Sequence, residues 1–262
     1  MKLSISNIGW EAENDDAVYK LMKKHGYSGL EIAPTRLFPE NPYYQSGKAK
    51  EWAEGIKAKY GLVVSSMQSI WFGRQEKIFG TKEERKFLLD YTKKATDFAE
   101  CIGCSNLVFG CPKNRNLPEN AKEETAIAFF RELGDYAVRH NMVISMEANP
   151  TIYNTNYIND TFSAVQLIEK VGSAGFKLNL DVGTMVCNSE GISDLAGKVK
   201  LISHVHISEP GLALIEKRNL HKELRDVLTT EKYQGFVSVE MGKRENLRDI
   251  EAAICYIREV FD

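Results

Sequence analysis

Short apolar segments alternate with longer amphipathic segments along the whole chain, and this alternation constrains the fold most strongly. Strand-like runs occupy residues 3–8, 29–33, 62–68, 105–110, 142–149, 176–183, 201–208 and 236–241. Helical patterns lie between them at 14–25, 46–60, 82–101, 119–140, 160–171, 190–198, 219–229 and 244–260. Strict alternation predicts a parallel sheet with right-handed crossovers, and eight units close such a sheet into a barrel. We therefore expect an α/β protein, a (β/α)8 TIM barrel that forms a single domain over residues 1–262.

The turn after the first strand argues against the alternative architecture, an open doubly wound sheet. It reads SNIGWEAEN and lacks the GxGxxG pattern with which such sheets bind dinucleotides. The phosphate-binding pattern GxxxxGK[ST] occurs nowhere in the chain. We therefore expect no nucleotide cofactor.

Composition and charge restrict the class of partner. The formal net charge is −2 and no basic run occurs, so we expect no nucleic-acid partner. No apolar stretch is long enough to span a bilayer, and the N-terminal residues lack the apolar block of a signal peptide. The 5 cysteines are an odd number, which is a poor disulfide framework. These features predict a cytoplasmic protein without a membrane partner.

Polar side chains end four consecutive predicted strands, where the chemistry of such barrels is found. They are Glu147, Asp181, His206 and Glu240. Positions two residues earlier share the same face of each strand, and they hold Ser145, Asn179, His204 and Ser238. The residues between are all apolar. The inward face of these strands is therefore expected to be polar in two successive layers.

Three carboxylates at one point would repel one another, and a divalent cation removes that conflict. Carboxylate oxygens with one imidazole suit Mn²⁺ or Mg²⁺ best, and Co²⁺ or Zn²⁺ are the alternatives. A single His or Glu at a strand end is usually a structural residue, but four on consecutive strands favour a metal site. The polar layer beneath would then supply hydrogen bonds that hold the ligands in place.

Four segments of the chain resemble a known family. SMEANP, NLDVGT, HVHISEP and SVEM look like the metal-binding strand ends of the xylose-isomerase-like sugar phosphate isomerase/epimerase superfamily. This superfamily includes ketose 3-epimerases, inosose dehydratases, hydroxypyruvate isomerases and, more distantly, endonuclease IV. The resemblance covers essentially the whole chain, including GLEIAPTRLFP and VFGCPKNR. It implies that Glu147, Asp181, His206 and Glu240 are the metal ligands, and that Glu147 and Glu240 also transfer protons.

The resemblance implies a divalent-metal-dependent isomerase or epimerase of a keto sugar or sugar phosphate. The metal would stabilise an enediolate while the two glutamates remove and return a proton. The sequence leaves open the sugar, its phosphorylation, the metal, and a homo-oligomeric state. A dehydratase of an inosose-like substrate is the nearest alternative reaction. An endonuclease IV-like phosphodiesterase would need more histidines than this chain offers, and a non-catalytic sugar-binding barrel is a further alternative.

Side chains in the loops after the strands are the candidate substrate contacts. The set comprises Glu31, Gln68, Trp71, Lys113, Arg115, Asn149, Tyr153, Thr184, Glu209 and His221. Thr184 stands where the ketose epimerases carry the His of a DxxH motif, so a substrate contact is either missing or supplied by another residue such as His221.

Several of these candidates have an alternative structural role. Glu31 could instead form a salt bridge with Arg36, and Trp71 could pack with Phe72 between loop and barrel. Lys113 and Arg115 could hold a phosphate or carboxylate, or could simply be solvated loop charges. Glu209 could bond a substrate hydroxyl or orient His221.

Overall fold

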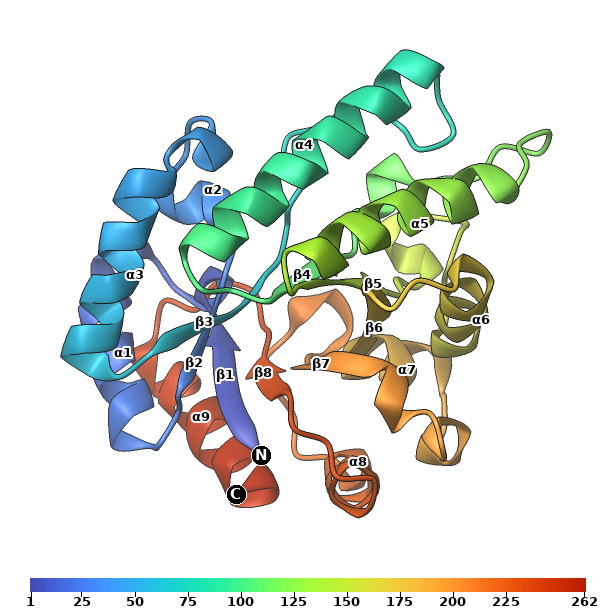
Figure 1. The fold of residues 1–262 in the computed structure, drawn as a ribbon. Coiled ribbons are helices and arrows are strands. Elements are labelled where there is room, and N and C mark those ends of the chain that lie inside the picture. Colours follow the sequence, from blue (N-terminus) through green and yellow to red (C-terminus); the bar gives the residue numbers. More distant parts are fainter.

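The computed structural model describes residues 1–262 and shows a closed barrel of eight parallel strands in chain order (Figure 1). The strands are β1 Lys2–Ser6, β2 Gly29–Ile32, β3 Val63–Met67, β4 Asn106–Phe109, β5 Val143–Glu147, β6 Phe176–Asp181, β7 Ile202–Ile207 and β8 Phe236–Val239. Each strand pairs with the next, and β8 pairs with β1. All eight predicted strands and the predicted barrel are therefore confirmed.

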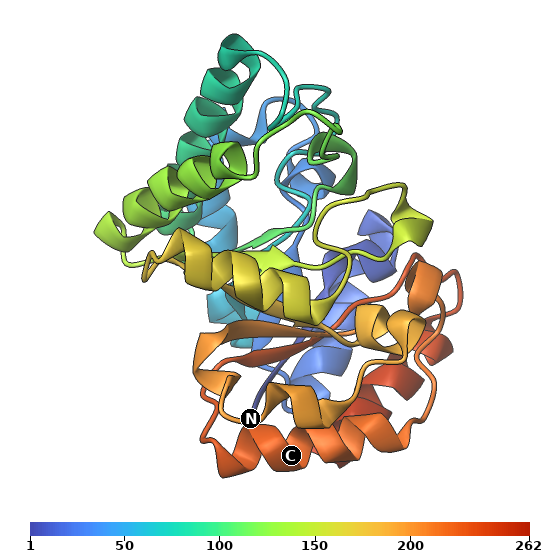
Figure 2. The ribbon, with the colours of Figure 1, turned by 90° about the vertical axis from the view of Figure 1, so that its right-hand side faces the viewer.

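Helices surround the barrel on its outside, and the two termini lie close together (Figures 1 and 2). The helices are α1 Asp15–Lys24, α2 Pro34–Leu37, α3 Ser46–Tyr60, α4 Lys82–Cys101, α5 Glu124–Arg139, α6 Thr161–Val171, α7 Val182–Asn188, α8 Asn219–Thr230 and α9 Leu247–Phe261. The amino group of Met1 donates a hydrogen bond to the carbonyl oxygen of Phe261 at 3.3 Å, which joins the two ends of the chain. None of the helices combines the length and the apolar content needed to cross a membrane.

The apolar core lies between the strands and the helices. Met146, Leu180, Val205 and Val239, which alternate with the polar strand-end residues, are fully buried there. Burial of each such side chain contributes about 1.5–3 kcal/mol to stability. Because the outward strand residues supply this core, the inward residues at the carboxyl ends are free to be polar, as the alternation predicts.

The region after β6 differs from the prediction. The strand predicted to reach residue 183 ends at Asp181, because the Asp181 carboxylate accepts hydrogen bonds from the backbone N–H groups of Gly183 and Thr184 and so caps α7. The helix predicted over 190–198 is reduced to the single 3₁₀ turn Ile192–Leu195. The chain leaves that turn through Gly197, whose φ of 74° does not belong to a helix.

Candidate metal centre and active site

Three of the four predicted ligands meet at the carboxyl end of the barrel. The Nδ1 atom of His206, at the end of β7, lies 2.9 Å from Oε1 of Glu147 and 3.2 Å from Oε2 of Glu240. The three ligand atoms all lie within 4.8 Å of one another. Burial lowers the pKa of His206, but the surrounding carboxylates outweigh it and raise that pKa well above its usual value. Two carboxylates and one imidazole fit a divalent cation, and they leave room in its coordination shell for substrate oxygens.

Asp181 faces the same cleft but does not belong to this three-atom cluster. Its Oδ1 accepts hydrogen bonds from the Ser208 hydroxyl and the N–H of Gly183. Its Oδ2 accepts from the N–H and the hydroxyl of Thr184, at 3.1 and 2.8 Å. Burial, followed by the charges of Glu147 and Glu240, raises the pKa of Asp181 to about 7. The role of Asp181 as the fourth ligand stays a prediction, and a cation there would have to displace one of these four hydrogen bonds.

The cleft beside the ligands has a volume of about 180 Å³. Its lining residues are Gln68, Ser69, Val108, Gly110, Cys111, Pro112, Glu147, Asn149, Tyr153, Asp181, Leu212 and Glu240. Three predicted substrate contacts, Gln68, Asn149 and Tyr153, are therefore in the cleft. Asn149 also donates a hydrogen bond to Oε2 of Glu147 at 3.1 Å, and the Tyr153 hydroxyl accepts one from the N–H of Gly211.

Sequence reasoning missed Gly110, which follows β4 in the segment VFGCPKNR. A Cβ atom at this position would lie 2.7 Å from Oε2 of Glu147, so a larger residue would force that carboxylate to shift. The signal was present as a glycine directly after a strand, since such a residue often permits close approach of a neighbour.

Comparison with known proteins places the chain in a family. The sequence pattern of the family described as xylose isomerase-like TIM barrel matches residues 19–260. The chain belongs to this family. A comparison with curated proteins gives no match.

Solved structures with low sequence identity to this chain have the same fold. The 3-keto-D-glucoside 4-epimerase of E. coli is 19% identical, with 99% of each chain covered and a TM-score of 0.78. The D-psicose 3-epimerase of Clostridium cellulolyticum H10, solved with D-tagatose, is 17% identical, with 100% of each chain covered and a TM-score of 0.79. A family 2 AP endonuclease of Brucella melitensis is 20% identical over 100% of each chain, with a TM-score of 0.76. At these identities the similarity establishes the fold.

In this xylose isomerase-like barrel Glu31 lies beneath the ligands rather than in the cleft. It is fully buried, its Oε1 lies 2.9 Å from Nε2 of His206, and its Oε2 accepts a hydrogen bond from Ser238. Burial alone would raise the pKa of Glu31, but the neighbouring imidazoles hold it well below its usual range. The predicted substrate contact is therefore wrong. The alternative salt bridge is also wrong, because Arg36 pairs with Asp15 at 2.6 Å.

Of the lower polar layer, only Asn179 contacts the ligands directly. Its side-chain amide donates to Oε1 of Glu147 at 2.8 Å and lies 3.2 Å from Nδ1 of His206. Two other residues of this layer contact Glu31 instead. Ser238 hydrogen bonds Glu31, and Nε2 of His204 lies 3.5 Å from Oε1 of the same residue. Ser145 instead donates to the backbone carbonyl of Leu107, so its predicted support of the ligands is wrong.

Arg115 stabilises the backbone around the site instead of facing an anion. Its fully buried guanidinium donates to the carbonyl oxygens of Gly110, Glu147 and Ile158 and to Oδ1 of Asn149, at 2.7–3.1 Å. Burial lowers the pKa of Arg115 to about 10. The predicted anion contact is therefore wrong for Arg115, because both terminal nitrogens are used within the protein and the fully buried side chain does not line the cleft. Lys113 is exposed and outside the cleft, as its solvated alternative requires.

Trp71 and Thr184 are both core residues. The Trp71 ring packs edge-on against Phe109 and Phe129, and its Nε1–H donates to Thr92. Trp71 therefore packs between loop and barrel, as its alternative role predicts, but without Phe72, which is exposed, and its predicted substrate contact is wrong. The buried Thr184 hydroxyl donates to the carbonyl of Ala148 and to Asp181, so this residue positions Asp181 instead of contacting a substrate.

Glu209 and His221 both have protein partners away from the cleft. Arg218 donates to both carboxylate oxygens of Glu209. The Nδ1 atom of His221 lies 2.9 Å from the Tyr256 hydroxyl, and burial lowers the pKa of His221 to about 4. Neither residue lines the cleft and no hydrogen bond joins them, so the predicted substrate contacts and the predicted pairing are wrong.

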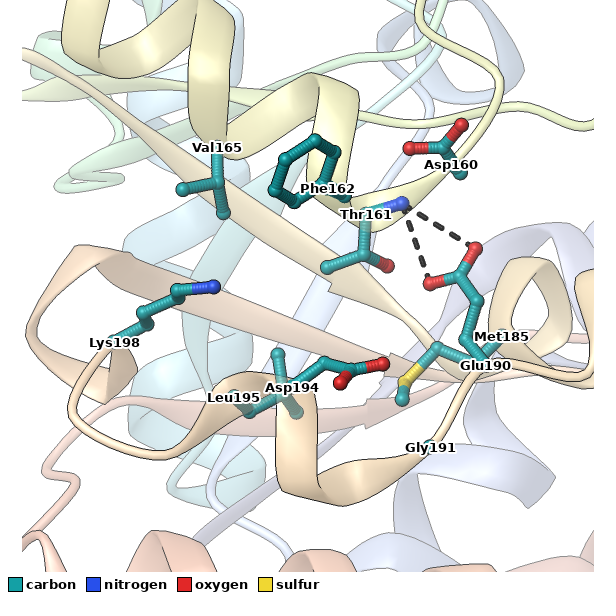
Figure 3. Close-up of a pocket in the computed structure, with 10 residues that line it drawn as sticks. All are labelled: Asp160, Thr161, Phe162, Val165, Met185, Glu190, Gly191, Asp194, Leu195 and Lys198. Carbon is teal, nitrogen blue, oxygen red and sulfur yellow. Dashed lines mark hydrogen bonds between the residues drawn. The ribbon is translucent and has the colours of Figure 1, made fainter.

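A second pocket, of about 390 Å³, lies outside the barrel between the N-terminus of α6 and the turn after α7 (Figure 3). Its carboxylates belong to Asp160, Glu190 and Asp194, and the first two have structural partners. Glu190 accepts hydrogen bonds from the N–H of Thr161, and Asp160 caps α6 through Ser163. The larger pocket therefore lacks the convergent ligand set of the cleft.

Proposed function

We propose that this barrel is a divalent-metal-dependent isomerase or epimerase of a keto sugar or sugar phosphate. The observation that carries the proposal is the meeting of Glu147, His206 and Glu240 within 4.8 Å, at the edge of a cleft that Asp181 also lines. The fold neighbours named as sugar epimerases support the substrate class. Mn²⁺ or Mg²⁺ is the cation we expect, and the cytoplasmic location and any homo-oligomer remain predictions.

The donor set fits a cation for an electrostatic reason. Burial, and then the nearby charges of Glu147 and Glu240, raise the pKa of Asp181. A bound divalent cation would neutralise this charge and act as a Lewis acid that polarises a substrate carbonyl. Glu147, His206, Glu240 and, in the proposal, Asp181 would hold it.

Glu147 and Glu240 would carry the proton. A carbon acid beside a ketone needs a base positioned within hydrogen-bond reach, and both carboxylates line the cleft. Burial raises the pKa of Glu240, which brings it closer to the neutral range where a carboxyl can both accept and return a proton. Glu147 is held from two sides by the side-chain amides of Asn149 and Asn179, which fixes its orientation toward the substrate.

The test is hydrogen exchange in D₂O. Metal-loaded protein is incubated with a panel of ketoses, inososes and their phosphates, and deuterium incorporation is followed by NMR. We expect exchange at a carbon next to the carbonyl, with an epimer or isomer among the products. An enone would instead indicate the dehydratase, and no exchange with any substrate would contradict catalysis.

Variants assign the exchange to the cleft. Glu147→Gln and Glu240→Gln should each abolish exchange, because an amide cannot accept the proton. Glu190→Gln changes a carboxylate of the second pocket and should leave exchange at the wild-type rate. Exchange that survives both cleft substitutions would show that the proposed proton carriers are wrong.

A further inference from the structure

Glu31 is a charged residue that the proposed reaction does not use. It lies at the end of β2, and its carboxylate reaches across the barrel interior to the histidines of β7. It is fully buried, so its partners must come from the protein. These partners are Nε2 of His206 at 2.9 Å, the Ser238 hydroxyl at 2.9 Å and, less closely, Nε2 of His204 at 3.5 Å.

The backbone is irregular at the positions that bring these groups together. Two of the eight strand pairings carry a register shift, one between Leu30 and Glu31 and the other between Leu178 and Asn179. Such irregularities re-aim a side chain relative to a regular strand. Here each shift adjoins a residue that contacts His206: Glu31 on the Nε2 side and Asn179 on the Nδ1 side.

Both nitrogens of His206 face carboxylates, but only the carboxylates at Nδ1 line the cleft. Nδ1 faces Glu147 and Glu240 in the cleft, where a cation would need a lone pair. Nε2 faces Glu31, an acceptor that is best satisfied by an N–H group. When a cation takes the place of a proton at Nδ1, the ring keeps one proton, and the hydrogen bond to Glu31 holds that proton on Nε2.

We propose that Glu31 is a positioning residue, which holds the proton of His206 on Nε2 and so directs the Nδ1 lone pair toward the cation site between Glu147 and Glu240. The inference rests on the proposed function for the identity of the group at Nδ1. Carboxylates behind metal-binding histidines commonly have this effect, and their loss weakens metal binding about 10- to 100-fold.

The same atoms permit one competing interpretation. Glu31, His204 and His206 present ligand atoms within 4.8 Å of one another, which is also compatible with a second cation. All three are fully buried, so such an ion would have no open coordination position for substrate. The number of ions bound per chain separates the two interpretations.

The first experiment measures the affinity for Mn²⁺ by electron paramagnetic resonance of the free ion. Glu31→Gln keeps the shape of the side chain but removes its charge, and Glu31→Ala removes the acceptor as well. We expect dissociation constants about 10-fold higher for Gln and about 100-fold higher for Ala. Asp15→Asn is the matched control, because it neutralises the carboxylate that pairs with Arg36 away from the site, and it should bind Mn²⁺ like the wild type.

The second experiment observes the ring proton of His206 directly and needs no substitution in the site. Long-range ¹H–¹⁵N correlation spectra of the metal-free and Mg²⁺-loaded wild type should show a protonated Nε2 in both. A deprotonated Nε2 would overturn the proposal even if no metal binds, and so would unchanged Mn²⁺ affinity in both variants. Two ions per wild-type chain and one in Glu31→Ala would favour the second cation instead. A wild type that binds no Mn²⁺ but keeps Nε2 protonated would contradict the proposed function alone.

Discussion

Asp181 makes the stability of the metal-free protein depend on pH. Its carboxyl has an ordinary pKa of 3.8, which burial and the charges of Glu147 and Glu240 raise to about 7 in the folded chain. The folded state therefore holds this proton more tightly than the unfolded state. The stability that results is fully present below the unfolded pKa, and it is lost as the pH rises through the folded pKa.

The magnitude follows from the size of the rise. Each pKa unit corresponds to about 1.4 kcal/mol, so a rise from 3.8 to about 7 corresponds to at most about 4 kcal/mol. His221 acts in the opposite direction, because burial lowers its pKa to about 4 and its contribution grows as the pH rises above that value. The wild type alone therefore shows the sum of opposing effects, and Asp181→Asn is needed to isolate one of them.

The assay is urea unfolding of metal-free wild type and Asp181→Asn at several values between about pH 4 and pH 8. The difference in unfolding free energy, wild type minus variant, should fall by several kcal/mol as the pH rises, because only the wild type has the Asp181 proton to lose. His221 is present in both proteins, so its contribution cancels in this difference. Saturating Mn²⁺ should remove the fall, since a cation favours the ionised carboxylate. A difference that stays flat or increases with pH would refute the reasoning.

Three further substitutions test the contacts that hold the site. Gly110→Ala would place a Cβ atom 2.7 Å from Oε2 of Glu147 and so displace this carboxylate. Substrate exchange in D₂O should fall at least about 10-fold, while the free energy of unfolding should change by less than about 1.5 kcal/mol. Exchange at the wild-type rate would contradict this. Arg115→Met leaves the acceptors of the guanidinium without donors, so the free energy of unfolding measured in urea should fall by about 3 kcal/mol. A fall below about 1 kcal/mol would show that solvent replaces the hydrogen bonds of Arg115. Thr184→Val removes the hydroxyl that hydrogen bonds to Asp181 and Ala148, so the free energy of unfolding should fall by about 1–2 kcal/mol in the same assay. An unchanged unfolding midpoint would show that these hydrogen bonds contribute nothing to stability.

Periodicity in the sequence predicted the barrel and the convergence of Glu147, His206 and Glu240, because alternation along a strand determines which side chains face inward. It did not predict the depth of Glu31. Strands in a closed barrel are staggered, so two strand ends need not lie at the same height, and a register shift at Glu31 adds to this stagger. The assumption that every strand ends at the mouth placed Glu31 in the cleft, whereas it lies beneath His206.

The buried role of Arg115 depends on geometry that no local pattern contains. Its acceptors include the backbone carbonyls of Gly110, Glu147 and Ile158, which come from three separate segments of the chain. Any residue type supplies a carbonyl, so the sequence offers no signal for this set. The cap formed by Asp181 was accessible in principle, since Asp followed by the glycine and threonine of DVGT is a plausible helix start.

The central claim is that one divalent cation sits among the strand-end ligands, and anomalous diffraction from crystals grown with Mn²⁺ tests it most directly. The account predicts a single anomalous peak per chain within coordination distance of Glu147, His206 and Glu240, with Asp181 as the fourth protein ligand. An anomalous map without a peak there, or carboxylates that turn away from one another in the presence of Mn²⁺, would contradict it.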